Sequence, residues 1–399
     1  MYLLTINCGS TSIKFKLYEM PKESVIAEGK IENIGLPSSI LTLKSGDYSE
    51  KETPYPIPDH RAGLEIVLKK LSSDEVGAIK DKNDIKAVGH RVVNVGDRTN
   101  AHSIIDDEML SIIRQSLELA PLHNPPNLLG IEVCKEIFTE IPHIAIFDNI
   151  FHKDLPEYAY LYGLPYDYYE KYRIRKYGFH GIAYSSMMAR LAEFIDRKPE
   201  ELKIVAIMLG GGASISAVRN GKSIDTSMGF TPTEGLIMST RCGDIDPAII
   251  PFLMKKENMT PGQADDLINK KSGFLGLSRS KYSDFRKLSK GYREKDPDCI
   301  RAMNCFVYRI KKYIGMYAAV MNGVDAIIFG GGIGENSPNL RAEILREMDY
   351  LGIKIDETKN SSIPGEGLIN SDNSKVKVFV ARLDEELMIA RETYRLMSS

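Results

Sequence analysis

Residues 3–17 and residues 204–217 share one pattern, repeated half a chain apart. In each segment an apolar run, typical of a buried strand, leads into a short turn that contains glycine, and apolar and polar residues then alternate. Such a turn leaves backbone N–H groups free to point at an anion. A third apolar run, within residues 325–336, also ends in glycines. These repeated strand-to-glycine turns predict a duplicated α/β fold with a nucleotide clamped between its halves.

The arrangement resembles that of the superfamily that contains actin, the ATPase domains of large chaperones and the sugar kinases. The resemblance implies a duplicated actin-like or sugar-kinase-like ATPase fold, α/β in class, with two domains and a central cleft. One isolated glycine-serine turn would indicate an ordinary hairpin instead. The repetition along the chain is what favours the nucleotide-binding fold.

The composition is that of an ordinary globular protein, with 43% hydrophobic and 27% charged residues in 399. A formal net charge of −2 gives no electrostatic reason to expect nucleic acid or an acidic membrane surface as a partner. The five cysteines contain no C-x-x-C pair and are typical of reduced thiols rather than of disulfides or a zinc site. We also see no signal peptide and no apolar run long enough to span a membrane. We therefore expect a cytoplasmic protein.

Apolar periodicity outlines the remaining secondary structure. Strands are expected at residues 25–34, 40–44, 87–93 and 144–148, and helices at 60–71, 105–120, 127–138, 184–195, 299–322 and 384–397, with a further helix that starts at Pro247. Asp384 is the expected N-cap of the last helix. We expect a surface loop at residues 53–59 and a connecting segment at 158–177. Residues 228–247 have no apolar period, and so long a loop in a compact domain is usually functional.

The residues also meet the needs of phosphoryl transfer, which are phosphate-binding loops, a divalent metal, and cations over the transferring group. The glycine turns provide loops, carboxylates and amides provide oxygen ligands for a metal, and planar guanidinium groups match phosphate oxygens. Taken alone, each arginine is more often part of a structural ion pair. The candidates are the turns at Gly9, 210–212 and 330–332, the possible metal ligands Asn7, Asp148 and Glu385, and the cations Arg91 and Arg241.

Seven motifs in this order resemble those of the acetate kinases, and they cover essentially the whole chain. They are NCGSTSIK (7–14), GHRVV (89–93), APLHNPPN (120–127), IFDNIFH (146–152), YGFHG (177–181), MGFTPTEGLIMSTRCGDIDP (228–247) and FGGGIGEN (329–336). The resemblance implies reversible, in-line transfer of the ATP γ-phosphate to acetate, which gives acetyl phosphate and ADP. It also implies Mg²⁺ or Mn²⁺ and a homodimer. Residues 1–149 with 385–399 would form a first actin-like domain that takes back the final helix, and residues 150–384 a second one with the adenosine loops.

The resemblance also assigns a role to each matching position. The implied catalytic residues are Asp148, Arg91, His180, Arg241 and His123, and the implied metal positions are Asn7 and Glu385. The implied pocket for the acetate methyl group is Val93, Leu122, Phe179 and Pro232. The implied nucleotide residues are Ser10, Ser12 and Lys14; Gly210, Gly211 and Gly212; Asp284, Phe285 and Arg286; and Gly332, Ile333, Gly334, Glu335 and Asn336.

Simple acid–base chemistry qualifies one of these roles. A carboxylic acid substrate with a pKa of about 4 to 5 is already ionised at neutral pH and needs no general base. We therefore assign Asp148 mainly to ordering the metal and its waters. His90 and His152, which also lie in the motifs, are expected to be structural histidines.

The chain departs from the family next to the second glycine turn. Met208 and Gly211 stand where most members have a histidine and an asparagine. We expect weaker or less selective nucleotide binding, because these residues offer no side-chain donor to a phosphate.

Other functions remain open at this stage. A propionate kinase of the same family is close, since one methylene changes binding by only about 1 to 3 kcal/mol. A butyrate kinase fits the motifs less well. A non-catalytic nucleotide switch of the actin-like superfamily would share the glycine turns but would not need Arg91, His180 and Arg241 together.

Overall fold

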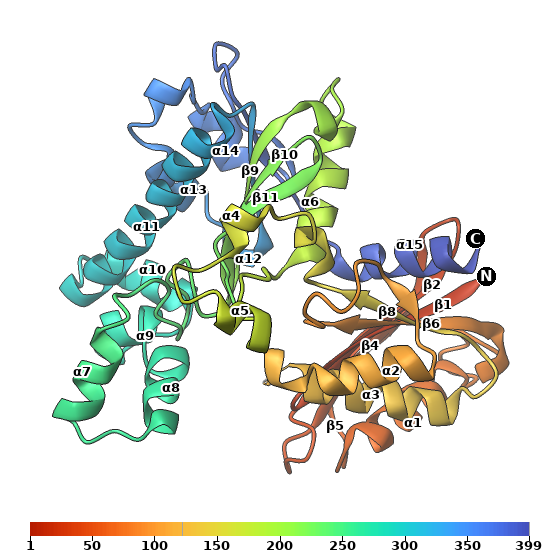
Figure 1. Cartoon of the computed structure of the whole chain (residues 1–399). Coiled ribbons are helices and arrows are strands. Elements are labelled where there is room, and N and C mark those ends of the chain that lie inside the picture. The colour runs from red at the N-terminus through yellow and green to blue at the C-terminus, as the bar shows by residue number, and fades with distance from the viewer. Residues whose placement is uncertain (122, 399) are drawn as a thin grey trace. The chain divides into compact units, whose positions relative to one another are not determined.

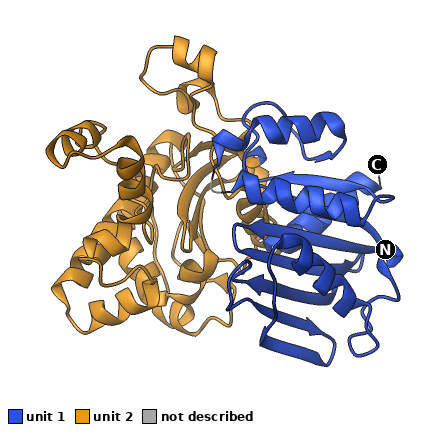
Figure 2. Cartoon of the chain, turned by 90° about the horizontal axis from the view of Figure 1, so that it is seen from below, with its two compact units in different colours: residues 1–150, 384–399 blue, residues 151–383 orange. Residues whose placement is uncertain are grey.

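A computed structural model describes residues 1–121 and 123–398 (Figure 1). The predicted pocket residue Leu122 lies outside the described residues. The chain forms two compact units, residues 1–150 with 384–399 and residues 151–383 (Figure 2). No helix of the described chain has both the length and the apolar character needed to cross a bilayer.

The first unit is built on a mixed sheet. Its strands are β1 (Tyr2–Gly9), β2 (Ser12–Glu19), β3 (Ser24–Glu32), β4 (Ile40–Ser45), β5 (Tyr48–Pro54), β6 (Ile85–Val92), β7 (Ser103–Ile104) and β8 (His143–Phe147). Their order in the sheet is β5-β4-β3-β2-β1-β6-β8-β7. Neighbours from β1 to β5 are antiparallel, whereas β6 is parallel to both β1 and β8. The carboxyl ends of β1, β6 and β8 therefore lie at one edge.

Helices cover both faces of this sheet. α1 (His60–Leu71) and α3 (Asn124–Ile137) pack on one face, and α15 (Glu385–Met397) lies along the other, across β1, β6 and β8 (Figure 1). Alternate residues of β1 are buried on each face, as expected for a strand covered on both sides. Gly89 of β6 lets α15 approach closely, since a Cβ there would overlap Thr393.

The second unit repeats this topology. Its strands are β9 (Lys203–Leu209), β10 (Ala213–Arg219), β11 (Lys222–Thr226), β12 (Ala326–Gly330), β13 (Gly367–Leu368) and β14 (Lys377–Val380). The order β11-β10-β9-β12-β14 matches the order β3-β2-β1-β6-β8 of the first unit. The parallel and antiparallel pairings of the strands match as well. The duplicated α/β fold predicted from the glycine turns is confirmed.

The helices of the second unit pack around this sheet. α6 (Gly181–Phe194) packs against β9 and β12, and α11 (Pro297–Met321), the longest helix of the described chain, packs against β9 and β10. The shorter helices are α4 (Glu157–Tyr160), α5 (Asp167–Tyr172), α7 (Ile249–Lys256), α8 (Pro261–Lys270), α9 (Gly273–Leu277), α10 (Phe285–Arg293), α12 (Gly331–Asn336), α13 (Pro338–Leu345) and α14 (Glu357–Ser362).

Several expected elements differ from those observed. The helix expected at 105–120 is shorter, because α2 (Asp107–Gln115) gives way to a 3₁₀ turn at Leu117–Leu119. Strand β5 was not expected, and the connecting segment 158–177 contains α4 and α5. The helix expected from Pro247 begins at Ile249. By contrast, Asp384 caps α15 as expected, with its Oδ1 accepting from the Leu387 amide, and residues 228–247 contain no helix or strand.

Candidate active site

Three predicted site residues lie at the carboxyl ends of neighbouring parallel strands in the first unit. Asn7 lies near the end of β1, Arg91 lies near the end of β6, and Asp148 directly follows β8. The ladder pairs Ile6 with His90, so Asn7 and Arg91 follow side by side. Open α/β sheets bind their ligands at this edge.

These residues also face the same side of the sheet. Gly89 faces α15. Arg91 lies two residues further along the same strand, so its side chain is on the same face of the sheet. Lys14 pairs directly with Asn7 across the hairpin. Asp148 comes two residues after Ile146, the ladder partner of Arg91, and α15 begins on this face with Glu385. The fold thus brings together Asn7, Lys14, Arg91, Asp148 and Glu385.

Arg91 is the centre of this group. Its Nη2 and Nε lie 2.6 Å and 3.1 Å from Oδ2 of Asp148, and its Nη1 lies 3.6 Å from Oε2 of Glu385. Burial lowers the pKa of Arg91, but the negative charges of Asp148 and Glu385 outweigh burial and raise it. Arg91 is therefore a permanent cation held between two carboxylates.

The other oxygen of Asp148 has no such contact. Its Oδ1 is buried and has no hydrogen-bond partner among the described residues. A buried carboxylate oxygen without a partner is costly unless it receives a cation or a donor. Burial, aided by the charges of Asp148 and Glu386, raises the pKa of Glu385, against the attraction of Arg91 and Lys14. Both carboxylates would gain from a bound cation, although no cluster of three or more His, Cys, Asp or Glu side chains suited to a metal occurs in the described chain.

Two side chains outside the predicted site hold the first glycine turn. Nε2 of His60 donates to the carbonyl of Gly9 at 2.7 Å, and Nδ2 of Asn127 donates to the carbonyl of Cys8 at 2.8 Å. Because a trans peptide points its C=O and N–H in opposite directions, the amide of Ser10 points away from His60. Ser10 itself is exposed and Ser12 half-buried.

Asn127 also fixes the predicted pocket residue Val93. Its Oδ1 accepts from the Val93 amide at 3.2 Å, and the Val93 side chain is buried. His123 is the residue directly before α3. Its backbone N–H donates a hydrogen bond to the carbonyl of Ala120 at 2.9 Å. Sequence reasoning missed His60 and Asn127, because their partners lie far away along the chain.

In the second unit, His180 precedes α6 in a left-handed backbone conformation, with φ of 62°. Its Nδ1 lies 2.8 Å from Oγ of the buried Ser214, which in turn lies 2.5 Å from the Tyr184 hydroxyl. This contact orients the ring. The neighbouring residue Phe179 is buried, and its carbonyl lies 3.0 Å from Nε2 of His152.

Arg241 is partly buried within the loop 228–247. Its Nη1 donates to the carbonyl of Pro232 at 3.3 Å, and burial lowers its pKa. No carboxylate of the described chain lies within ion-pair distance of it. A guanidinium without an acidic partner is suited to bind an anion.

One glycine joins His180 and Arg241. A Cβ placed on Gly212 would lie 3.5 Å from Nε2 of His180 and 3.7 Å from Nη1 of Arg241. The second glycine turn therefore brings these two predicted residues together. The other two motif histidines have structural partners, as expected: Nε2 of His90 lies 2.9 Å from Nδ1 of His143, and Nδ1 of His152 lies 2.8 Å from the Ser223 hydroxyl.

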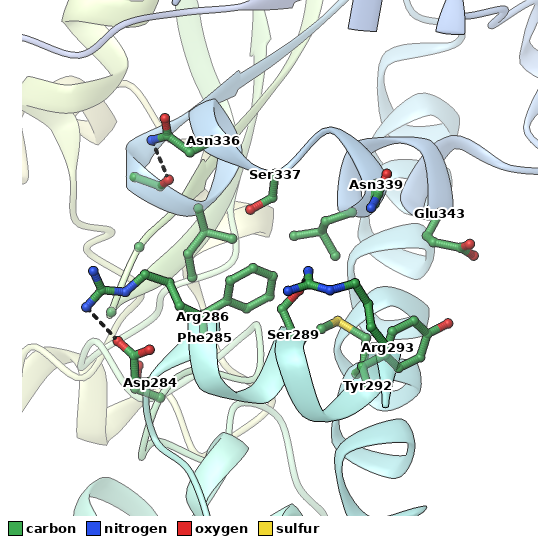
Figure 3. Close-up of a pocket in the computed structure, with 17 residues that line it drawn as sticks. Asp284, Phe285, Arg286, Ser289, Tyr292, Arg293, Asn336, Ser337, Asn339 and Glu343 are labelled. Atoms are coloured by element: carbon green, nitrogen blue, oxygen red, sulfur yellow. Dashed lines mark hydrogen bonds and ion pairs between the residues drawn. The ribbon is translucent and has the colours of Figure 1, made fainter. Parts of the chain in front are cut away.

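The same turn borders a pocket of about 860 Å³ (Figure 3). α10 supplies one wall, and the start of α12 and α13 another. Eight predicted nucleotide residues line this pocket, namely Gly210, Gly211, Asp284, Phe285, Arg286, Gly332, Ile333 and Asn336.

Other predicted nucleotide positions have structural contacts instead. Gly334 packs on Phe329, and Oε1 of Glu335 accepts from the Leu383 amide at 3.1 Å. Met208 does not line the pocket either, and packs against the apolar core beneath α6. Gly211 is therefore the departure from the family that bears on this pocket.

Comparison with known proteins agrees with these features. A family model described as the acetokinase family matches residues 2–391. Acetate kinase from Clostridium acetobutylicum is 50% identical over 393 residues, which cover 98% of this chain and 97% of that protein. Acetate kinase from Methanosarcina thermophila is 48% identical over 399 residues, 100% of this chain and 98% of that protein.

Solved structures agree as well. The crystal structure of Porphyromonas gingivalis acetate kinase matches with a TM-score of 0.94 at 40% identity, over 99% of both chains. A propionate kinase from Francisella tularensis matches with a TM-score of 0.92 at 35% identity, again over 99% of both. The two-unit α/β architecture, consistent with an actin-like ATPase fold, is thus that of short-chain carboxylate kinases. The chain belongs to the acetokinase family.

Proposed function

We propose that this protein transfers the γ-phosphate of ATP to acetate, reversibly, to give acetyl phosphate and ADP. The observation that carries the proposal is the position of the second glycine turn. On one side, Gly210 and Gly211 line the large pocket, and on the other, Gly212 meets His180 and Arg241. A turn between a nucleotide pocket and two phosphate-binding side chains is what phosphoryl transfer needs.

The main obstacle in this reaction is electrostatic, because an anionic acceptor must approach a polyanion. Arg91 binds the acetate carboxylate, which is already ionised and needs no base. Arg241 and His180 stabilise the charge that spreads over the transferring group, with His123 near it. Val93, Leu122, Phe179 and Pro232 form the pocket for the methyl group.

Mg²⁺ or Mn²⁺ is the proposed metal. Asp148, whose Oδ1 is buried without a partner, and Glu385, whose pKa is raised, fit a divalent cation, and Asn7 adds an amide oxygen. Such oxygen ligands suit Mg²⁺, which usually keeps several waters. A metal held by these residues would neutralise phosphate charge. Ser10, Ser12 and Lys14 bind phosphate oxygens, and the pocket-lining residues bind the adenosine.

The activity can be tested with the purified protein, ATP, Mg²⁺ and acetate. Hydroxylamine converts an acyl phosphate into a hydroxamate, so its formation reports transfer to a carboxylate. ATP hydrolysis without hydroxamate would overturn the proposal. Transfer from pyrophosphate and not from ATP would overturn the nucleotide assignment.

Propionate is a second candidate acceptor, because the solved propionate kinase shares this fold over nearly the whole chain. A panel of two- to four-carbon acids in the same assay discriminates between the two. A nucleotide switch would bind ATP and form no hydroxamate with any acid.

We further propose that the two compact units are the two actin-like domains and that the protein works as a homodimer in the cytoplasm. All five cysteines are free, which suits a reducing compartment. Light scattering on the purified protein tests the dimer.

A further inference from the structure

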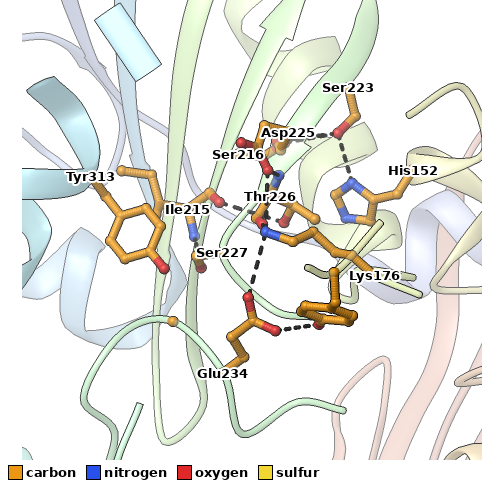
Figure 4. Close-up of polar contacts among 12 residues, drawn as sticks. His152, Lys176, Ile215, Ser216, Ser223, Asp225, Thr226, Ser227, Glu234 and Tyr313 are labelled. Carbon is orange, nitrogen blue, oxygen red and sulfur yellow. Dashed lines mark hydrogen bonds and ion pairs between the residues drawn. The ribbon is translucent and has the colours of Figure 1, made fainter. Parts of the chain in front are cut away.

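A polar cluster lies beside the loop that carries Arg241 (Figure 4). Its members are Tyr162, Lys176, Asp225 and Glu234, and we call it the Lys176 cluster. Nζ of Lys176 donates to the carbonyl of Thr226 at 2.8 Å and to Oδ1 of Asp225 at 3.3 Å, and it lies 3.6 Å from Oε1 of Glu234. Only 14% of the Lys176 side chain is exposed, so these contacts are partly shielded from water.

The second carboxylate oxygen of Glu234 also has a hydrogen-bond partner. The Tyr162 hydroxyl donates to Oε2 of Glu234 and accepts from the Phe230 amide at 2.8 Å. Burial, and then the charge of Glu234, raise the pKa of Tyr162, so the hydroxyl keeps the proton that it donates. Glu234 is therefore fixed on one side by a cation and on the other by a neutral donor.

The cluster ties together the two segments that carry His180 and Arg241. Lys176 lies four residues before His180, and Glu234 lies seven residues before Arg241. Between them, the carbonyl of Gly229 accepts from the amides of Tyr177 at 3.1 Å and Gly178 at 3.4 Å. A Cβ on Gly229 would overlap Glu234 and Tyr162, so the crossing has no room for a side chain.

Within the loop, the cluster holds the part against which Arg241 rests. The Arg241 guanidinium donates to the carbonyl of Pro232, two residues before Glu234. The backbone near Arg241 has its own supports, since Thr240 Oγ1 donates to the Asn269 carbonyl at 2.8 Å and the Cys242 amide donates to the Ile268 carbonyl at 2.9 Å. Thr233, next to Pro232, donates to Asn269, and the Gly235 amide donates to Asp244 at 2.7 Å. Loss of the cluster would thus shift Pro232 and the guanidinium tip and leave the loop attached.

We propose that Lys176, Glu234 and Tyr162 are positioning residues, which fix Pro232 and the Arg241 guanidinium relative to His180. This inference rests on the proposed function. A positioning role and a general stabilising role have different consequences for the kinetics of the variants. The acyl acceptor and the transferring phosphate depend on the cluster, whereas ATP binding does not, because no cluster residue lines the nucleotide pocket.

The test uses the full-length protein with Lys176→Met, Glu234→Gln and Tyr162→Phe. Glu234→Gln is the mildest change, because the glutamine oxygen still accepts from Tyr162 while the attraction to Lys176 is lost. We expect kcat to fall by about ten- to hundredfold and the KM for acetate to rise, since small misplacements of catalytic groups have effects of this size. The Kd for ATP, measured by calorimetry, should stay within about twofold of the wild-type value. Lys176→Arg, which keeps the charge, should recover part of kcat.

Glu366→Gln is the matched control. It breaks the pair between Arg190 and Glu366, whose side chains are 30% and 20% exposed. Both residues lie in the same unit as the cluster and outside the loop 228–247. This variant should keep wild-type kcat and acetate KM. Wild-type kinetics in Glu234→Gln, or an equal loss of ATP affinity and acetate turnover, would overturn the inference. An inactive wild-type protein in the hydroxamate assay would instead overturn the proposed function.

Discussion

The side-chain amide of Asn127 donates to the carbonyl of Cys8 at 2.8 Å, at a point where strands β1 and β6 have separated. The ladder between these strands ends at the pair Ile6–His90. Beyond it, Asn127 binds Cys8 with one end of its amide and Val93 with the other. One buried side chain thus replaces a rung of the sheet, between the first glycine turn and the strand that carries Arg91.

This bridge predicts a loss of both stability and activity in Asn127→Leu. The substitution leaves a buried carbonyl and a buried N–H unpaired, at a cost of about 1–3 kcal/mol each. Urea unfolding should show this loss at an unchanged m-value, and the kcat of the folded fraction should also fall. A leucine variant as stable and active as the wild type would contradict the bridging role.

The two arginines should respond differently to removal. Arg241→Met should lower kcat by about 10³ to 10⁵, as loss of an arginine over a phosphoryl group does. Arg91→Met should also lower turnover by orders of magnitude, because the acetate carboxylate loses the cation that binds it beside the phosphate. Stability should separate them. Without Arg91, the carboxylates of Asp148 and Glu385 are uncompensated, at a cost of about 3–5 kcal/mol. Among the described residues Arg241 has no acidic partner to leave behind, so its removal should hardly change the melting temperature. If a folded variant keeps near-normal turnover, the arginine that it lacks has no role in the reaction.

Glu385→Gln should stabilise the metal-free protein while it lowers activity. The folded-state pKa of Glu385 lies above its unfolded value, so the folded state retains the proton to higher pH than the unfolded state does. The carboxyl group therefore costs stability as pH rises above the unfolded value of about 4.3, and the cost is complete above the folded pKa. Thermal melts of wild type and variant should coincide at low pH and separate as pH rises, with the variant more stable. If the melting temperatures of wild type and variant coincide at every pH, the ionised Glu385 carboxylate does not lower the stability of the protein.

Acyl preference should follow the size of Val93. Val93→Ala removes two methyl groups from a buried side chain. It leaves intact the hydrogen bond from the Val93 backbone N–H to Asn127. We expect kcat/KM for propionate to rise relative to acetate by about tenfold or less. If the ratio does not change, Val93 is not part of the acyl pocket.

Gly211→Asn should strengthen nucleotide binding. The glycine lines the pocket, its φ is not in the left-handed region, and a Cβ there would meet only Ser239 Oγ, at 3.9 Å. A hydrogen bond to a charged phosphate is worth about 1.5–3 kcal/mol, so the Kd for ATP should fall by about ten- to hundredfold. Gly211→Ala is the control and should change the Kd little. The substitution is made without Met208→His, because Met208 packs in the core rather than in the pocket.

Local patterns were sufficient for much of the fold. The hairpins and the capped start of α15 could be predicted because apolar alternation, glycine turns and an Asp N-cap act over a few residues. Strand β5 could not, because the charged and exposed residues of YSEKETP give an edge strand no apolar alternation. The short helices α4 and α5 have no side-chain cap.

The candidate site was predictable to a different extent. Arg91, Asp148 and Glu385 are far apart in sequence. The needs of phosphoryl transfer made them candidates, and the family resemblance gave each of them a role before the structure brought them together. The supporting residues had no local signal. Asn127 binds Cys8 from 119 positions away, and His60 binds Gly9 from 51 positions away. An asparagine or a histidine in a helix looks ordinary until its distant partner is known.

The placement of α15 has a consequence for how the protein is made. A ribosome releases the chain from its N-terminus, so β1, β6 and β8 emerge long before the helix that covers them. Until residues 385–397 have left the ribosome, the sheet face that bears Arg91 and Asp148 lacks both its apolar cover and Glu385. We therefore expect a chain that is cut short before α15 to leave this face exposed and to transfer no phosphate to acetate.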